Sequence, residues 1–154
     1  MKRRVFLLAV AVCVLTTLSF AADPLMGTWK LNEGKSKFAP GAPKNQTVVY
    51  EAAGDSVKVT IDGTDAGGKA VHNEWTGKFD GKDYPVSGDT ASGDARSYTK
   101  VNDRTMSFTV KQGGKTVNKG RIVISPDGKT RTVTTTATGA AGNKSTSTAV
   151  YDKG

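Results

Sequence analysis

The sequence predicts an all-β domain, an antiparallel up-and-down meander of about ten strands that closes into a barrel. Short β-prone runs recur along the chain, and clusters of Gly, Asn and Asp separate them at short intervals. No window of helical period is long enough to provide a crossover helix, so each strand is expected to pair antiparallel with its predecessor. Closure would also remove the edges that an open ten-stranded sheet exposes to aggregation.

The first 21 residues have the features of a secretory signal peptide. Lys2-Arg3-Arg4 precedes an uncharged apolar run over residues 5–20, and Ser19-Phe20-Ala21 forms a small-x-small cleavage site. The alternative is a retained membrane anchor, but the run is shorter than the roughly 20 residues that a spanning helix needs. We therefore expect cleavage after Ala21, a periplasmic or secreted location, and a single barrel domain over residues 22–154 with no stable membrane span.

The predicted domain contains no cysteine, because Cys13, the only one in the chain, lies in the signal. Packing and strand pairing must therefore stabilise it without a disulfide. It carries 19 basic and 14 acidic residues, a net charge of +5. The lysines are scattered through turns without the basic runs and interleaved aromatic residues of a nucleic-acid groove, so we expect a soluble monomer with no nucleic-acid partner.

Ten segments are expected to be strands, with tight turns between them. Their ranges are Gly27–Asn32, Gln46–Ala53, Ser56–Gly63, Val71–Phe79, Asp83–Val86, Ala95–Val101, Thr105–Gln112, Lys115–Ser125, Thr130–Thr138 and Ser145–Asp152. Turn signals such as Ala53-Gly54-Asp55, Asn102-Asp103 and Gly113-Gly114 supply the residues that hairpin turns favour, because Gly, Asn and Asp tolerate positive φ.

Apolar and polar residues alternate in the second, third, fourth and seventh of these strands, which identifies the face expected to point inward. Residues expected inside are Val48, Tyr50, Ala52, Val57, Val59, Ile61, Val71, Trp75, Phe79, Met106, Phe108 and Val110. Residues expected outside are Lys58, Thr60, Lys78, Ser107, Thr109 and Lys111. One face is therefore apolar and the other faces solvent.

The ninth and tenth strands are rich in threonine and serine and poor in large apolar side chains. Two interpretations of this composition remain open. The hydroxyl groups line an internal cavity, or threonine is present only because β-branched side chains favour strands. In both cases these strands supply little bulk to fill the space opposite the apolar strands.

The segment Gly27-Thr28-Trp29-Lys30-Leu31 resembles the Gly-x-Trp first strand of the lipocalins and fatty-acid-binding proteins. The end of the chain, from Gly120 to Lys153, resembles the last three strands of the same calycin superfamily. Through Lys35-Ser36-Lys37-Phe38 and residues 80–86, the chain after the signal resembles a group of small exported bacterial lipocalin-like proteins with no established role. The resemblance implies a calycin-type barrel in which Gly27 and Trp29 are structural.

In the lipocalins that this chain resembles, the tryptophan closes one end of the barrel and lies under a basic side chain from a late strand. The resemblance therefore implies a cation–π partner for Trp29, and Arg121 and Arg131 are the two residues expected to supply it.

Two departures from the fatty-acid-binding proteins bear on function. Those proteins insert a helix pair after the first strand, but residues 33–45 contain Pro40, Gly41 and Pro43, so the mouth is expected to be open or covered by a loop. They also hold the ligand carboxylate with Arg-x-Tyr on the final strand, where this chain has Ala149-Val150-Tyr151. Tyr151 matches and the arginine does not, so the resemblance does not imply carboxylate binding.

Nothing in the sequence indicates catalysis, and we expect a protein that is not an enzyme and has no cofactor or metal. His72, the only histidine, shares a strand face with Glu74 opposite Trp75, and one histidine with one carboxylate is too few ligands for zinc. The Gly-x-Ser-x-Gly nucleophile motif is also absent from the sequence. His72 is therefore expected at the surface.

Two functions remain open. In the first, the barrel interior binds a small apolar ligand. The candidate ligand-binding residues are Tyr50, Ile61, Trp75, Tyr98 and Phe108, with Arg121 or Tyr151 fixing a polar end. Trp75 has a competing role in core packing. In the second, the barrel is a non-enzymatic binding or structural module of the cell envelope with a filled core that acts through its surface. A sizeable cavity distinguishes the first from the second.

Overall fold

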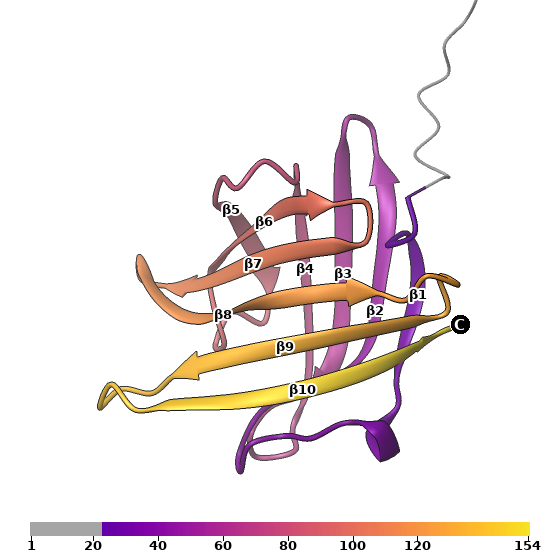
Figure 1. Cartoon of the computed structure of the whole chain (residues 1–154). Coiled ribbons are helices and arrows are strands. Elements are labelled where there is room, and N and C mark those ends of the chain that lie inside the picture. Colours follow the sequence, from indigo (N-terminus) through magenta and orange to yellow (C-terminus); the bar gives the residue numbers. More distant parts are fainter. Residues whose placement is uncertain (1–22) are drawn as a thin grey trace, which may run out of the picture.

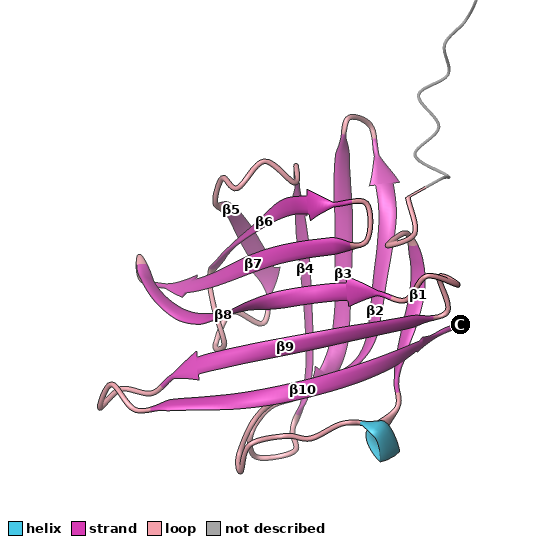
Figure 2. Cartoon of the chain, in the orientation of Figure 1, coloured by secondary structure: helices cyan, strands magenta, loops and turns pink. Residues whose placement is uncertain are grey.

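A computed structural model describes residues 23–154 of the protein. The signal peptide predicted over residues 1–21 lies outside the described residues. The elements, coloured by type in Figure 2, are β1 (Gly27–Leu31), the 3₁₀ helix η2 (Glu33–Lys35), β2 (Lys44–Ala53), β3 (Ser56–Thr64), β4 (Ala70–Gly77), β5 (Tyr84–Gly88), β6 (Ala95–Asn102), β7 (Thr105–Gln112), β8 (Lys115–Ile124), β9 (Thr130–Thr138) and β10 (Lys144–Lys153). In this part of the chain no helix has the length and apolar character needed to cross a membrane.

The ten strands form one closed antiparallel barrel (Figure 1). Each strand from β2 to β10 pairs with the strand before it. The ring closes where β1 pairs with β10, with Leu31 opposite Tyr151. The prediction of an all-β meander of ten strands that closes into a barrel is therefore confirmed.

Observed and predicted strand ends differ by two residues at three places, one of them the end of β5 at Gly88 rather than Val86. β2 begins at Lys44 rather than Gln46, because a bulge near its start lets its pairing with β3 continue. β4 ends at Gly77 rather than Phe79. Phe79 nevertheless stays beside the core, stacked on Trp75 with ring centroids 6.4 Å apart. The predicted inward direction of Phe79 is right although the predicted strand is two residues too long.

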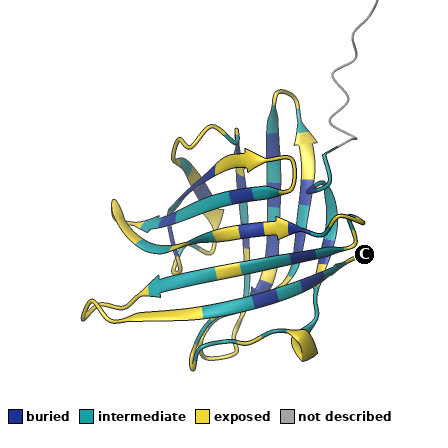
Figure 3. Ribbon diagram, viewed as in Figure 1, coloured by how far each residue is buried: buried dark blue, intermediate teal, exposed yellow. Residues whose placement is uncertain are grey.

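Most of the residues predicted to face inward lie in the core or pack against it (Figure 3). Val48, Val59 and Trp75 are at most 1% exposed, whereas Ala52, also predicted inside, is exposed near the end of β2. Gly77, next to Trp75 on the inner face, leaves room for an aromatic side chain: a Cβ there would lie 2.6 Å from the ring of Tyr84. The core is therefore richest in aromatic groups beside β4.

Trp29 closes one end of the barrel, as the resemblance to lipocalins implies. Its side chain is fully buried, and its indole N–H donates to the carbonyl oxygen of Leu25 at 2.8 Å. Leu25 precedes β1 and is itself buried. The segment in front of β1 therefore folds across this end and is tied to the barrel through Trp29.

The cation–π partner of Trp29 is Lys153, and the prediction of Arg121 or Arg131 is wrong. The Nζ of Lys153 lies 5.0 Å from the indole centroid, because the pairing of β1 with β10 places Lys153 directly opposite Trp29. Gly27 has φ +109° and lies under the same lysine, so that a Cβ would approach its Cε to 3.2 Å. Both the conformation and the space favour glycine at position 27.

Candidate functional site

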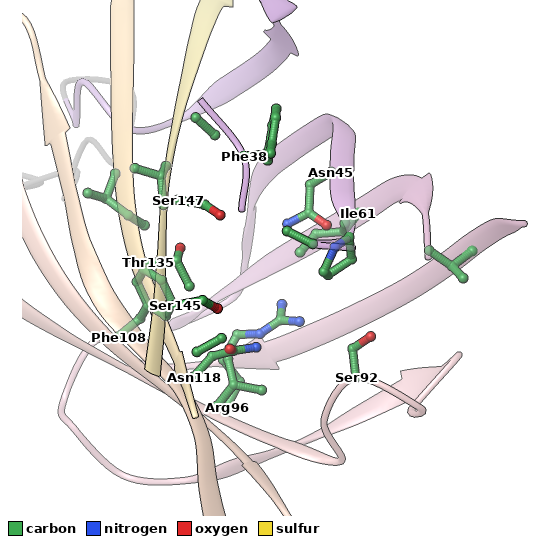
Figure 4. A pocket seen from close by; sticks show the side chains of 18 of the residues that line it. Phe38, Asn45, Ile61, Ser92, Arg96, Phe108, Asn118, Thr135, Ser145 and Ser147 are labelled. Atoms are coloured by element: carbon green, nitrogen blue, oxygen red, sulfur yellow. The ribbon is translucent and has the colours of Figure 1, made fainter. Parts of the chain in front are cut away.

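The barrel contains a cavity of about 280 Å³ between β2–β4 on one side and β6–β10 on the other. Figure 4 shows side chains from both sides, among them Ile61, Arg96, Phe108 and Ser147, turned toward it. The interior is therefore not packed solid, whereas the surface-module alternative requires a filled core. The small side chains of β9 and β10 explain the space, because Ala137, Ser145 and Ala149 stand where larger residues would fill it.

The threonine-rich strands serve both purposes that the sequence left open. Thr135 on β9 and Ser145 and Ser147 on β10 line the cavity. Thr134 and Thr136 alternate with Thr135 and point to the outer face, where Thr136 lies 3.5 Å from Thr146 across the strand pair. Hydroxyl groups thus line part of the cavity, while the intervening threonines satisfy the preference of strands for β-branched residues.

The loop after η2 borders the mouth of the cavity, and no helix pair occupies this place in the described chain. Phe38, Pro40 and Pro43 all line the cavity. The loop is fixed to β10, because the backbone N–H of Ala39 donates to the Ser147 hydroxyl at 2.9 Å and Lys37 forms a bridge with β10. A loop therefore stands beside the mouth, as one of the two predicted alternatives requires, and it places the Phe38 side chain at the entrance (Figure 4).

The structure brings four of the seven predicted binding residues to the cavity. Ile61, Tyr98, Phe108 and Tyr151 line it. Tyr50 and Trp75 do not line it; each is 1% exposed. For Trp75 the core-packing alternative is therefore the one observed.

Arg121 does not reach the cavity, and the prediction that it fixes a polar end is wrong. Its side chain is exposed on the outer face of β8, opposite Ser107 and Thr134 on the neighbouring strands. The physical reason is alternation: Ile122, the next residue, points inward and lines the cavity, so Arg121 points outward.

Two other arginines line the cavity, and the sequence analysis did not assign either to it. Arg96 on β6 is 8% exposed and Arg131 on β9 is 5% exposed. The alternation of side chains along a strand predicts the inward direction of both arginines. Arg96 has the same parity as Tyr98 on β6, and Arg131 has the same parity as Val133 on β9, so each shares a face with an inward-pointing residue.

Arg131 lies between two tyrosines at the inner end of the cavity. Its Nη2 donates to the Tyr50 hydroxyl at 2.9 Å. Its guanidinium carbon is 5.4 Å from the ring centroid of Tyr50 and 4.7 Å from that of Tyr151, the residue opposite it on β10. Burial raises the pKa of Tyr50 and of Tyr151 against the lowering effect of Arg131, so both phenols are neutral at pH 7 while the guanidinium is charged.

Arg96 is held on β6 by two contacts from β4. Its Nη2 donates to the Asn73 side-chain oxygen at 3.3 Å, and its own carbonyl oxygen accepts from the indole N–H of Trp75 at 2.8 Å. Trp75 therefore positions the backbone of a cavity residue without contacting the cavity. This hydrogen bond joins β4 to β6 directly, where the intervening strand β5 shares only two paired positions with β6.

His72 lies on the outer face, where the sequence predicts it. Its side chain is 54% exposed, and Nδ1 lies 2.6 Å from the Asp62 carboxylate, while Nε2 is 3.9 Å from Glu74. The hydrogen bond to Asp62 raises the pKa of His72 above its ordinary value. The folded state therefore favours the protonated imidazole, and this stabilisation is present below pH ~6.5 and is lost as pH rises through the folded pKa.

The Asp62→Asn substitution is expected to lower the pKa of His72 toward its unperturbed value of ~6.5. The reason is the loss of the first and strongest of its raising contacts. Because the chain has one histidine, its imidazole proton resonance can be followed through a pH titration by NMR without ambiguity. The Glu74→Gln control should produce a smaller decrease, and an equal pKa in the wild type and Asp62→Asn would contradict the assignment.

Comparison with known proteins identifies the fold but not a family. No family model and no curated protein matches the sequence. Among solved structures, that of EF1p2_mFAP2b bound to DFHBI has a TM-score of 0.51 at 12% identity, covering 87% of this chain and 97% of that one. That of the redesigned beta barrel mFAP1 bound to DFHBI has a TM-score of 0.47 at 16% identity, covering 86% and 98%.

At these identities the likeness concerns the backbone architecture alone. EF1p2_mFAP2b matches nearly its whole length to this chain, in agreement with the single closed barrel described above. The narrower resemblance to exported bacterial lipocalin-like proteins stays a prediction. This chain is therefore a ten-stranded antiparallel barrel with an internal cavity that two arginines line.

Proposed function

We propose that the protein binds a small, largely apolar molecule inside the barrel. The observation that carries this proposal is the cavity of about 280 Å³, bordered by Ile61, Phe108 and Val133 and entered beside the 38–43 loop. Ligand pockets are typically concave and mostly apolar with a few polar groups, which is the composition of this cavity. The proposal is binding without catalysis, supported by the position of the one histidine on the outer face.

The size of the cavity favours a compact ligand. It is near the lower limit of ~300 Å³ for ordinary ligand sites and about twice the ~150 Å³ cavity that holds benzene. A molecule with about two fused or linked rings fits these limits better than a long acyl chain does. EF1p2_mFAP2b, which has the same kind of fold, was solved bound to DFHBI, so this architecture is able to accept a small molecule.

The proposal places this binding in the periplasm or outside the cell. Support for the location comes only from residues 1–21, whose basic start, apolar run and Ser19-Phe20-Ala21 are typical of a cleaved signal. N-terminal sequencing of the protein recovered from the cell envelope tests it: a chain that begins at Ala22 supports export with cleavage, and a membrane-bound chain that begins at Met1 contradicts it.

Filling the cavity should abolish binding of an uncharged two-ring probe. In Ala149→Phe the new ring projects from β10 into the cavity, because Ala149 lines it. We expect the affinity for phenylnaphthylamine, measured by its fluorescence, to fall at least about tenfold, since ~1.4 kcal/mol of lost contact is sufficient. Circular dichroism would verify that the barrel is intact.

The matched control for this substitution is Val123→Phe, which adds a ring on the outer face of β8, where Val123 is 43% exposed. The control is expected to bind the probe as the wild type does. Equal affinity of Ala149→Phe and wild type, or no saturable binding of phenylnaphthylamine or any charged analogue to the wild type, would contradict interior binding.

A further inference from the structure

The cavity carries positive charge with no negative group to balance it. Arg96 and Arg131 line it, and none of the described residues around it is Asp or Glu. The two phenols next to Arg131 do not supply a negative charge, because burial raises the pKa of both Tyr50 and Tyr151. Within residues 23–154, every ion pair joins a lysine or His72 to a carboxylate, and neither arginine takes part in one.

The two guanidinium groups also have hydrogen-bond donors without acceptors. Nη1 of Arg96 and both Nε and Nη1 of Arg131 are buried and have no partner among the described residues. Buried donors are nearly always paired in proteins, and an unpaired donor on a charged group is especially unfavourable. Among the described residues, Arg96 donates a side-chain hydrogen bond to Asn73 and Arg131 donates one to Tyr50. These bonds fix each guanidinium and leave its other N–H groups available.

Both charges act on the same part of the interior. Each arginine lowers the pKa of the Tyr50 phenol, although burial outweighs them and the pKa is raised overall. The arginines come from β6 and β9, which β7 and β8 separate in the sheet, so their common position is a property of the closed sheet and not of one local motif. In a low-dielectric interior, two like charges near one point attract an anion strongly.

We infer that the ligand of this cavity is a compact organic anion, with a carboxylate or another oxyanion group accepting the free N–H groups of Arg131 and Arg96 and an apolar body against Ile61, Phe108 and Val133. The inference rests on the proposed function and adds the chemical class of the ligand. An oxyanion presents two or more acceptor atoms, which suits the planar fork of a guanidinium. The serine and threonine hydroxyls of β9 and β10 offer further donors beside the body.

A pair of fluorescent probes with nearly the same two-ring body tests the inference. Anilinonaphthalene sulfonate carries an anionic group, and phenylnaphthylamine lacks it. We expect the wild type to bind the sulfonate at least about tenfold more tightly than the neutral probe, because hydrogen bonds to a charged group contribute more than neutral ones. This comparison needs no variant and so does not depend on how a substitution affects folding.

Three variants then locate the anionic group. Arg131→Gln and Arg96→Gln each remove one internal charge, and each is expected to weaken sulfonate binding about ten- to one-hundredfold while changing the affinity for phenylnaphthylamine less than about threefold. Arg121→Gln removes the same charge from the outer face of β8 and should leave both affinities unchanged.

The outcomes separate the two proposals. Equal binding of both probes by the wild type, or sulfonate affinity unchanged in both Arg131→Gln and Arg96→Gln, overturns the anionic ligand and leaves interior binding standing. A loss in Arg121→Gln as large as in the internal variants also overturns it, since the sulfonate is then held by the surface. Failure of the wild type to bind either probe overturns the proposed function itself.

Discussion

Trp75→Ala is expected to lower the free energy of unfolding by about 3–5 kcal/mol, the usual effect of removing a fully buried tryptophan. Trp75 is 1% exposed and lies at the centre of an aromatic cluster. Its ring stacks on Phe79 and meets Tyr84 and Tyr98 edge to face, with centroids 5.6 and 4.8 Å away. Gly77 leaves the room in which Tyr84 and the indole meet, since a Cβ there would lie 2.6 Å from the Tyr84 ring and 2.7 Å from the indole.

The measurement is equilibrium unfolding in guanidinium chloride, followed by far-ultraviolet circular dichroism so that the signal does not depend on tryptophan. Trp75→Phe is the matched control, because it keeps much of the packing and removes the indole N–H that donates to the Arg96 carbonyl. Its loss should be smaller, at about 1–3 kcal/mol for the unpaired carbonyl and the reduced contact. A loss below about 1 kcal/mol in Trp75→Ala would show that the cluster does not stabilise the barrel.

Alternation made the fold of this chain predictable. Along β3 and β4, Val59, Ile61 and Trp75 point inward because a strand turns successive side chains to opposite faces, and burying one face in a barrel leaves only one register consistent with the sequence. The turns carried independent information, since most of them have a glycine at positive φ, although the turn between β6 and β7 has none. These two local signals are sufficient for a meander, in which every strand pairs with its neighbour in sequence.

The contacts of Trp29 and of the cavity depend on pairing between distant segments and were harder to predict. Lys153 lies over Trp29 only because β1 and β10 close the ring in one particular register. The sequence offered Arg121 or Tyr151 as the group that fixes a polar end, and of these only Tyr151 lines the cavity. Alternation excludes Arg121, because it precedes the inward-pointing Ile122, whereas Arg131 shares its face with Val133. Arg96 and Arg131 were not assigned to the interior, and buried charges that break the usual pattern are expected at functional sites.

Replacing Arg131 and Tyr50 together, by Met and Phe, is expected to raise the free energy of unfolding of the unliganded protein by about 1–4 kcal/mol. Arg131 is a buried charge that no carboxylate of residues 23–154 pairs with, and its hydrogen bond to Tyr50 and two aromatic faces are the compensation. Each cation–π contact contributes ~0.5–2 kcal/mol, less than the several kcal/mol needed to remove an ion from water. The double variant removes the charge and the hydroxyl that accepts from it, so that neither change leaves the other group without its partner.

The single variant Tyr50→Phe should have the opposite effect. It leaves the Arg131 charge in place and removes its hydrogen bond to Tyr50, which is expected to lower the free energy of unfolding by about 1–3 kcal/mol. Denaturant unfolding of the wild type, Tyr50→Phe and the double variant, each without ligand, measures the direction of both changes in the free energy of unfolding. If the double variant were less stable than the wild type, Arg131 would be a stabilising residue and its burial would need no ligand to explain it. A more stable variant that has lost its preference for the anionic probe would instead show that this chain retains a destabilising charge for binding, as functional sites commonly do.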